Sequence, residues 1–174
     1  MACNCVSRRS FLHAALASLG LCGCRATPQQ SSDGFATLRE PVEVPERTLG
    51  EHGGAYKFEA WFTAPDGSDK LIDGILLDND GQIAAYSTYC PHEVCPVKIE
   101  RNPARLRSVV APHANLPEHP VLYCTCHYAV FDTRAAGAQL SGPAPRGLYR
   151  FRFERDSDLI RVTHVEASIV ALFA

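Results

Sequence analysis

The sequence predicts a small, loop-rich, all-β domain. Proline and glycine contribute 12 residues each, and long helical periodicities are missing, which favours short strands joined by turns. Several segments alternate apolar and polar residues and are bounded by turn sequences such as DNDG at 78–81. The length of 174 residues leaves room for one domain and an appendage.

The strands are expected in the following order. YKFEAWFT (56–63) alternates and carries aromatic side chains, which suit a half-buried strand. LIDGILL (71–77) and QIAAYST (82–88) are expected to pair as a hairpin across DNDG. The remaining strand segments are VLYC (121–124), VFD (130–132), LYRFRFER (148–155) and LIRVTHV (159–165), the last two forming a hairpin.

Residues 1–26 are expected to be an export signal or a short anchor. Arg8 and Arg9 precede an apolar run from Phe11 to Gly23, and SRRSFL resembles the twin-arginine export signal. The run is shorter than the roughly twenty residues of a membrane-spanning helix. LCGC resembles a lipoprotein cleavage box, which makes Cys24 a candidate for lipidation. Cleavage, retention as an anchor and lipidation are the three alternatives.

Residues 27–50 are polar and contain three prolines, so we expect a flexible tether leading into a folded domain at 51–174. The expected location is the periplasmic side of the inner membrane, with the protein either anchored or soluble. The formal net charge of −2 shows no basic excess, so nucleic-acid binding is not expected.

The eight cysteines are concentrated in three stretches, which indicates a chemical role more than a packing role. Four lie near the N-terminus, and four lie in the motifs CPHEVC and CTCH. Cys90 and His92 are spaced C-x-H, and Cys124 and His127 are spaced C-x-x-H, so each pair can converge from one tight loop. Two sulfur and two nitrogen ligands suit zinc or an iron–sulfur centre.

A plain zinc site leaves Cys95 and Cys126 unexplained. A disulfide between them would clamp the two loops together, and export would supply the oxidising compartment that a disulfide needs. His113 and His119 lie between the motifs and are expected at the surface, since four ligands are already supplied. A basic run within 96–120 is either a solvated loop or a docking site for an acidic redox partner.

The motifs CPHEVC, CTCHYAVFD and SGPAP together resemble the Rieske proteins, whose boxes are C-x-H-x-x-C and C-x-C-H followed by a Gly-Pro-rich loop. The resemblance spans about residues 70–165. It implies a domain of small, packed antiparallel sheets with two cluster-binding loops at one end. It also implies one [2Fe–2S] cluster, with Cys90 and Cys124 on one iron and His92 and His127 on the other.

The resemblance is to the branch that contains a disulfide, represented by quinol–cytochrome c reductase and the small subunit of arsenite oxidase. It implies a disulfide between Cys95 and Cys126. It also implies that Gly142, Pro143 and Pro145 belong to the loop that covers the cluster.

Four positions depart from the pattern of high-potential relatives. Ala129 and Phe131 stand where a serine and a tyrosine donate hydrogen bonds to sulfur, and neither can donate. Glu93 replaces an apolar tip residue, and Tyr128 stands where glycine is usual, where it is expected to shield the cluster. Because hydrogen bonds to sulfur stabilise the reduced cluster, a reduction potential well below the roughly +300 mV upper end for Rieske centres is expected.

The sequence therefore predicts an exported electron-transfer protein and not a complete enzyme, since no nucleophile–base pair or phosphate loop is recognised. The favoured context is a membrane-associated, quinol–cytochrome c reductase-like complex, with a cytochrome b or c as redox partner and quinol as a candidate donor. An arsenite-oxidase-like molybdenum enzyme is the alternative. A structural Cys2His2 zinc module is the remote alternative.

Overall fold

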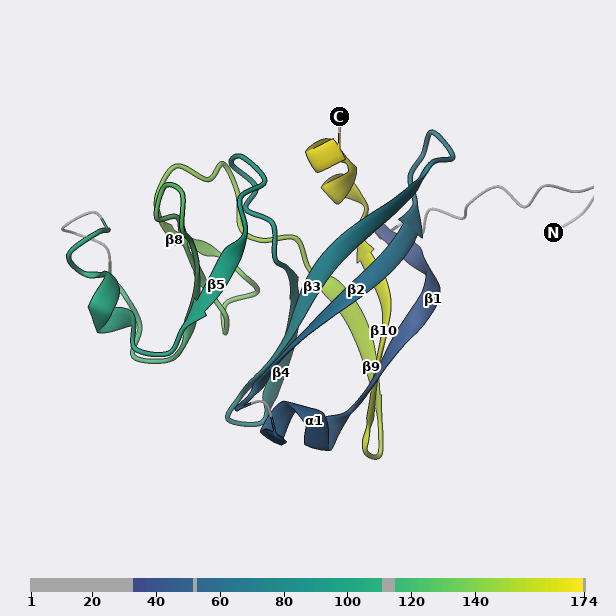
Figure 1. Ribbon diagram of the computed structural model, residues 1–174, viewed down its shortest axis with the longest axis horizontal. Coiled ribbons are helices and arrows are strands. Elements are labelled where there is room, and N and C mark those ends of the chain that lie inside the picture. The colour runs from purple at the N-terminus through teal and green to yellow at the C-terminus, as the bar shows by residue number, and fades with distance from the viewer. Residues whose placement is uncertain (1–32, 52, 111–114, 174) are drawn as a thin grey trace, which may run out of the picture.

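A computed structural model describes residues 33–51, 53–110 and 115–173, which form two β lobes (Figure 1). The base lobe is a six-stranded antiparallel sheet of order β4-β3-β2-β1-β10-β9. Its strands are β1 (Phe35–Pro45), β2 (Ala55–Thr63), β3 (Asp69–Asn79), β4 (Gln82–Ser87), β9 (Phe151–Asp156) and β10 (Leu159–Glu166). The predicted all-β class is confirmed.

The base sheet closes on itself. A bridge pairs Tyr86 at the end of β4 with Arg150 just before β9, and the Ser87 N–H donates to the Tyr149 carbonyl over 2.8 Å. The enclosed core contains apolar side chains from β1, β2, β3, β9 and β10, among them Phe62, Ile72 and Leu76, each with 0% of its surface exposed. Closure leaves few free strand edges in this lobe.

The smaller lobe contains the four-stranded antiparallel sheet of order β5-β6-β7-β8 (Figure 1). Its strands are β5 (Val97–Glu100), β6 (Val121–Cys124), β7 (Val130–Asp132) and β8 (Gln139–Ser141). Its second core joins the lobes, because Ile75 and Leu77 of β3 pack in the same cluster as Leu122 and Phe131. Strand β3 is therefore buried on both faces, which explains its nearly continuous apolar sequence.

The expected hairpins are confirmed. In the β3–β4 turn, Asp80 and Gly81 have φ of 56° and 86°, the pair of positive values that a type I′ turn requires. The Gly81 N–H also donates to the Asp78 carboxylate over 2.6 Å. This hairpin delivers the chain from the base lobe into the CPHEVC loop.

The structure differs from the expected tether. Residues 35–45 form β1, which pairs with β10, and Glu46–Glu51 form helix α1. Leu38 and Val44 are buried in the base core, so this segment gains apolar burial that a tether would lack. Pro41 is tolerated because it lies where the register shifts between Thr37 and Val42. The segment 1–26, including Cys24, lies outside the described residues.

The 96–120 segment, which carries the basic run, contains β5 and the 3₁₀-helix η1 (Pro103–Leu106) among its described residues. His119 was expected at the surface, but its side chain is only 18% exposed, and its Nε2 lies 2.7 Å from the Asp132 carboxylate of β7. His113 lies outside the described residues. A second 3₁₀-helix, η2 (Ala167–Phe173), packs against β1. No helix within the described ranges is long and apolar enough to cross a membrane.

Asp132 is expected to make stability pH-dependent. Burial alone would raise its pKa, but hydrogen bonds from His119 and from the Arg134 and Ala135 N–H groups lower the pKa below 3.8. The stability contributed by this lowered pKa is therefore present above 3.8 and is lost as pH falls through the lower folded-state value. Asp132→Asn should reduce the free energy of urea unfolding by about 1–2 kcal/mol near neutral pH.

This difference should shrink toward zero in acid, where Asp132 is neutral in both folded and unfolded chains. Glu154→Gln, an exposed change on β9, is the control and should have little effect. A difference for Asp132→Asn that stays constant through the acid range would contradict the pKa assignment.

Candidate metal centre

Two loops with the same backbone closure carry the candidate ligands. In the first loop the Val94 N–H donates to the Cys90 carbonyl, and in the second the Tyr128 N–H donates to the Cys124 carbonyl, over 3.0 and 3.1 Å. The cysteine N–H groups in turn donate to the carbonyls five residues on, over 2.9 and 2.8 Å. Each loop is thus held by two backbone hydrogen bonds.

Cys90 and Cys124 are the inward-facing residues of these loops. Both are free thiols with 1% of their surface exposed, and both belong to the core shared by the two lobes. Burial raises the pKa of the Cys90 thiol to about 11; the neighbouring Cys124 thiol also raises it, while the backbone N–H groups of His92 and Glu93 lower it. Two adjacent buried thiols form thiolates favourably only beside a strong positive charge. A metal centre supplies such a charge.

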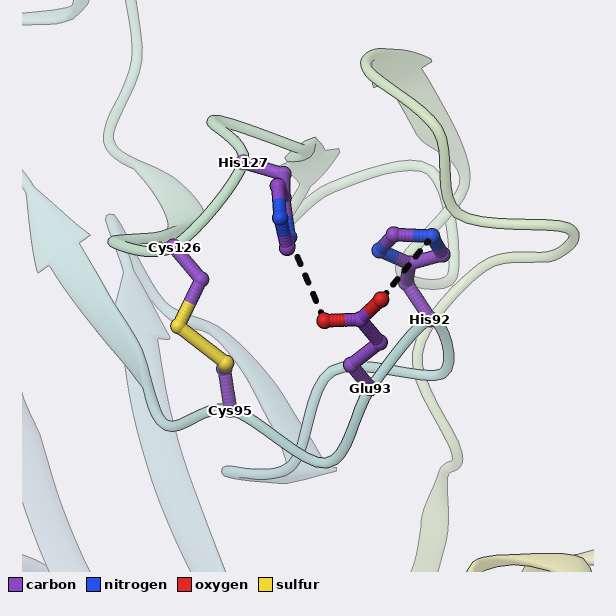
Figure 2. Close-up of a disulfide and its surroundings, with 5 residues drawn as sticks. All are labelled: His92, Glu93, Cys95, Cys126 and His127. Atoms are coloured by element: carbon purple, nitrogen blue, oxygen red, sulfur yellow. Dashed lines mark ion pairs between the residues drawn. A yellow bond between two sulfur atoms is a disulfide. The ribbon is translucent and has the colours of Figure 1, made fainter.

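His92 and His127 lie at the surface on the outer side of the same loops, with side chains 28% and 46% exposed. Their ring centroids are 4.9 Å apart, and the rings are nearly perpendicular. Figure 2 shows the Glu93 carboxylate between them, 3.9 Å from His92 Nε2 and 3.8 Å from His127 Nδ1. Glu93 follows His92 in the sequence, and the fold also brings its carboxylate against His127 of the other loop.

A disulfide between Cys95 and Cys126 joins the two loops covalently (Figure 2). The pairing expected from the resemblance is therefore present. The Cys124 sulfur lies within 4.8 Å of both disulfide sulfurs, so the bridge is next to one of the inward thiols. Because Cys124 ends β6 and Cys126 lies in the turn that follows, one cysteine faces the core and the other faces the first loop.

The SGPAP segment packs directly on the second loop. A Cβ atom at Gly142 would lie 2.4 Å from the Ala129 Cα, and Gly142 has φ of 94°, so both space and backbone conformation require glycine. Ala144 is buried in the shared core, while Pro143 and Pro145 are exposed on either side of it. This segment, called the covering loop below, therefore rests on the second cysteine loop, and its role toward a cluster stays a prediction.

Arg146 fastens the end of this loop to the base lobe, a contact that sequence reasoning missed. Its guanidinium forms two 3.0 Å hydrogen bonds to the Glu166 carboxylate of β10 and one of 2.8 Å to Ser168. It also stacks 4.2 Å from the Tyr149 ring centre. The partners lie about twenty residues apart in the sequence, and no local pattern signals their pairing.

The remaining tuning positions fall into two groups. Ala129 and Phe131 have no exposed surface and pack in the core that contains both free thiols. Tyr128 is 40% exposed and has a φ of 54°. Its side chain is therefore partly in solvent, and its role as a shield of the cluster stays a prediction.

The paired loops can be compared with known proteins. Residues 69–152 match the family described as the Rieske [2Fe-2S] domain. This chain carries a Rieske [2Fe–2S] domain. The family binds one [2Fe–2S] cluster and transfers electrons. No curated protein sequence matches significantly.

Two solved structures are similar to the Rieske domain and its surroundings. The plasma membrane Rieske protein PetC3 from the cyanobacterium Synechocystis PCC 6803 is 24% identical, with a TM-score of 0.41, covering 70% of this chain and 97% of that one. The soluble domain of the Rieske protein II (soxF) from Sulfolobus acidocaldarius is 21% identical, with a TM-score of 0.43, covering 72% and 78%.

The residues at the two loops fit a cluster with mixed sulfur and nitrogen ligands. The paired thiols offer two sulfurs in the interior. His92 Nδ1 is the one side-chain polar atom in the described ranges that is buried without a hydrogen-bond partner, as expected of a nitrogen reserved for a metal. His127 supplies the second imidazole from the facing loop. Within the Rieske domain, Cys90, Cys124, His92 and His127 could therefore hold the group.

Removing the disulfide should destabilise the Rieske domain. A double Cys95→Ala, Cys126→Ala variant opens a closed loop of 31 residues in the unfolded chain. The entropic model then gives a loss of about 3–4 kcal/mol in the free energy of unfolding. Urea unfolding of variant and parent under non-reducing conditions measures it. Reduction with dithiothreitol should lower parental stability and leave the double variant unchanged. If the oxidised parent has the same free energy of unfolding as the double variant, the disulfide does not stabilise the domain.

Removing the Arg146 contact should loosen the covering loop. In Arg146→Met the Glu166 carboxylate, only 12% exposed, loses the nearer of its two guanidinium partners and keeps Arg150 at 3.5 Å, so unfolding free energy should fall by about 1–3 kcal/mol. Hydrogen exchange at 141–149 should rise more than in the base sheet. Arg161→Met, which breaks the exposed Arg161–Glu43 pair, is the matched control, expected at about 1 kcal/mol or less. Equal effects of both variants would argue against the anchoring role.

Proposed function

We propose that this protein is an exported electron-transfer subunit whose cluster is held by Cys90 and Cys124 at one iron and by His92 and His127 at the other. One observation supports the proposal: the candidate sulfur ligands and the candidate nitrogen ligands differ in solvent exposure. The two thiols are 1% exposed, whereas the imidazoles are 28% and 46% exposed. Electrons would therefore enter and leave at the histidine end.

The charge at the histidine end would also influence electron transfer. When bound, the cluster supplies one-electron redox chemistry, and reduction adds one negative charge beside His92 and His127. The Glu93 carboxylate, 3.9 Å from His92 Nε2 and 3.8 Å from His127 Nδ1, would disfavour that additional negative charge.

Export is supported by the SRRSFL sequence and by the disulfide, since a stable disulfide needs an oxidising compartment. We propose that residues 1–26 are the export signal or anchor and that the folded unit begins near β1. The periplasmic face of the inner membrane is the proposed location.

The partner complex has two candidates. A quinol–cytochrome c reductase-like complex is the first, with quinol as donor and a cytochrome as acceptor. The second is an arsenite-oxidase-like molybdenum enzyme, in which this subunit would pass electrons from one protein to another. The position of Glu93 favours the second, because a 58% exposed carboxylate between the imidazoles is poorly accommodated in an apolar quinone pocket.

Metal analysis with EPR spectroscopy on the natively matured protein tests the proposed function. We expect two irons per chain and a Rieske-type EPR signal that appears on reduction. Zinc in place of iron, with no signal, would support the structural zinc module and reject electron transfer. Co-purification of a cytochrome b or a large molybdenum subunit would distinguish the two complexes.

Restoring hydrogen-bond donors should raise the reduction potential. Ala129→Ser and Phe131→Tyr place hydroxyl groups in the core that holds both thiols. A hydrogen bond that stabilises the reduced form by about 1–1.5 kcal/mol raises a one-electron potential by roughly 40–65 mV. EPR-monitored titration measures each midpoint, and thermal unfolding checks that the buried hydroxyl is accommodated.

The parent midpoint should lie well below roughly +300 mV. Ala135→Ser, an exposed change in the β7–β8 turn, is the control and should leave the midpoint unchanged. A parent value near the ceiling, or no increase in either variant, would contradict this account of tuning.

A further inference from the structure

Each cluster loop contains one residue that is not glycine but has a left-handed backbone. The φ angles are 58° at Val94 and 54° at Tyr128. These are the two residues whose N–H groups close the loops on the cysteine carbonyls, so the loop conformation itself requires positive φ. Glycine adopts this conformation without steric penalty, whereas a β-branched or aromatic residue is strained there.

Both strained residues expose apolar side chains. Val94 is 41% exposed and Tyr128 is 40% exposed, and among the described residues the other large hydrophobic side chains with such exposure are Trp61 and Val109. Neither Val94 nor Tyr128 belongs to an apolar core that would offset the strain. Strain combined with apolar exposure at a functional site indicates that these side chains gain their contacts outside the chain.

One negative charge lies close to both residues along the chain, because Glu93 precedes Val94 and lies 3.8 Å from His127, which precedes Tyr128. The Glu93 side chain is 58% exposed and lies against both imidazoles (Figure 2). A partner that covers this surface also covers the carboxylate. Covering it without a positive charge nearby is unfavourable, so a complementary partner places a lysine or arginine opposite Glu93.

We propose that Val94 and Tyr128 are docking contacts for a redox protein whose electron-transfer surface combines apolar residues with lysine or arginine side chains. Val94 and Tyr128 provide the apolar contacts, one from each loop, and Glu93 provides the charge. This inference rests on the proposed electron-transfer function and names the class of partner for the same site.

Part of the basic run in the 96–120 segment lies away from this surface. Lys98 lies at the end of β5 near the loops, whereas Arg105 lies on η1, beyond the opposite end of that strand. Strand β5 has four residues, which span about 13 Å. An acidic partner bound through Arg105 would therefore engage a different part of the small lobe from the exposed histidines.

Stopped-flow oxidation of the reduced holoprotein by cytochrome c, a basic redox protein, tests the inference. The variants are Val94→Gly and Tyr128→Gly, which remove the side chain and relieve the backbone strain. Ser157→Gly is the matched control, because Ser157 is also exposed and has a φ of 54° but lies in the β9–β10 turn of the base lobe. Ferricyanide, a small oxidant that needs no apolar docking, is the reference reaction.

We expect each loop variant to reduce cytochrome c about tenfold more slowly, with melting temperature unchanged or raised and the ferricyanide rate unchanged. Loss of an interface anchor has an effect of this size. Ser157→Gly should raise stability similarly and leave both rates unchanged. Glu93→Gln should weaken the dependence of the cytochrome c rate on ionic strength.

Unchanged cytochrome c rates in both loop variants, or equal slowing with cytochrome c and ferricyanide, would overturn the inference. A parent protein that fails to reduce cytochrome c would reject the class of partner. Variants that slow oxidation of a short-chain quinol instead would assign the surface to quinol. A parent without a Rieske EPR signal would contradict the proposed function itself, whereas a normal signal with unchanged rates would contradict only the docking role.

Discussion

The site depends on closing two short loops tightly enough to turn cysteine inward and histidine outward. In each loop the cysteine carbonyl accepts a hydrogen bond from the residue four positions later, and the cysteine N–H donates to the residue five positions later. This closure fixes Val94 and Tyr128 in a left-handed conformation. It also places a buried thiol and an exposed imidazole only a few residues apart. The sequence alone would not separate them in this way in an extended strand.

Three other contacts hold the closed loops together. The Cys95–Cys126 disulfide joins them to each other, Gly142 allows the covering loop to rest on the Ala129 backbone, and Arg146 ties that covering loop to Glu166. Burial of β3 on both faces connects the small lobe to the closed base sheet. The loops that carry the candidate ligands are therefore braced against the closed base sheet, which would limit reorganisation during the proposed electron transfer.

Much of this could be predicted from sequence, and the failures have identifiable physical causes. Strong alternation and the DNDG turn predicted the hairpins, and the CPHEVC and CTCH motifs predicted the paired loops, because these signals are local. Strand β1 was mistaken for a tether because its prolines and charges mask the alternation at Leu38, Val42 and Val44. The Arg146–Glu166 contact and the position of Glu93 between two histidines depend on tertiary folding, which no local pattern encodes.

We propose that two histidines and two cysteines, and not four cysteines, hold the cluster. Pulsed EPR of the reduced protein carrying ¹⁵N-labelled histidine tests it most directly, because only a ligating nitrogen couples strongly to the cluster. We expect two distinct histidine nitrogen couplings and no free thiols from Cys95 or Cys126. An iron–sulfur signal without histidine coupling would contradict the account, since the cluster would then be held by the four cysteines and the disulfide would not exist in the mature protein.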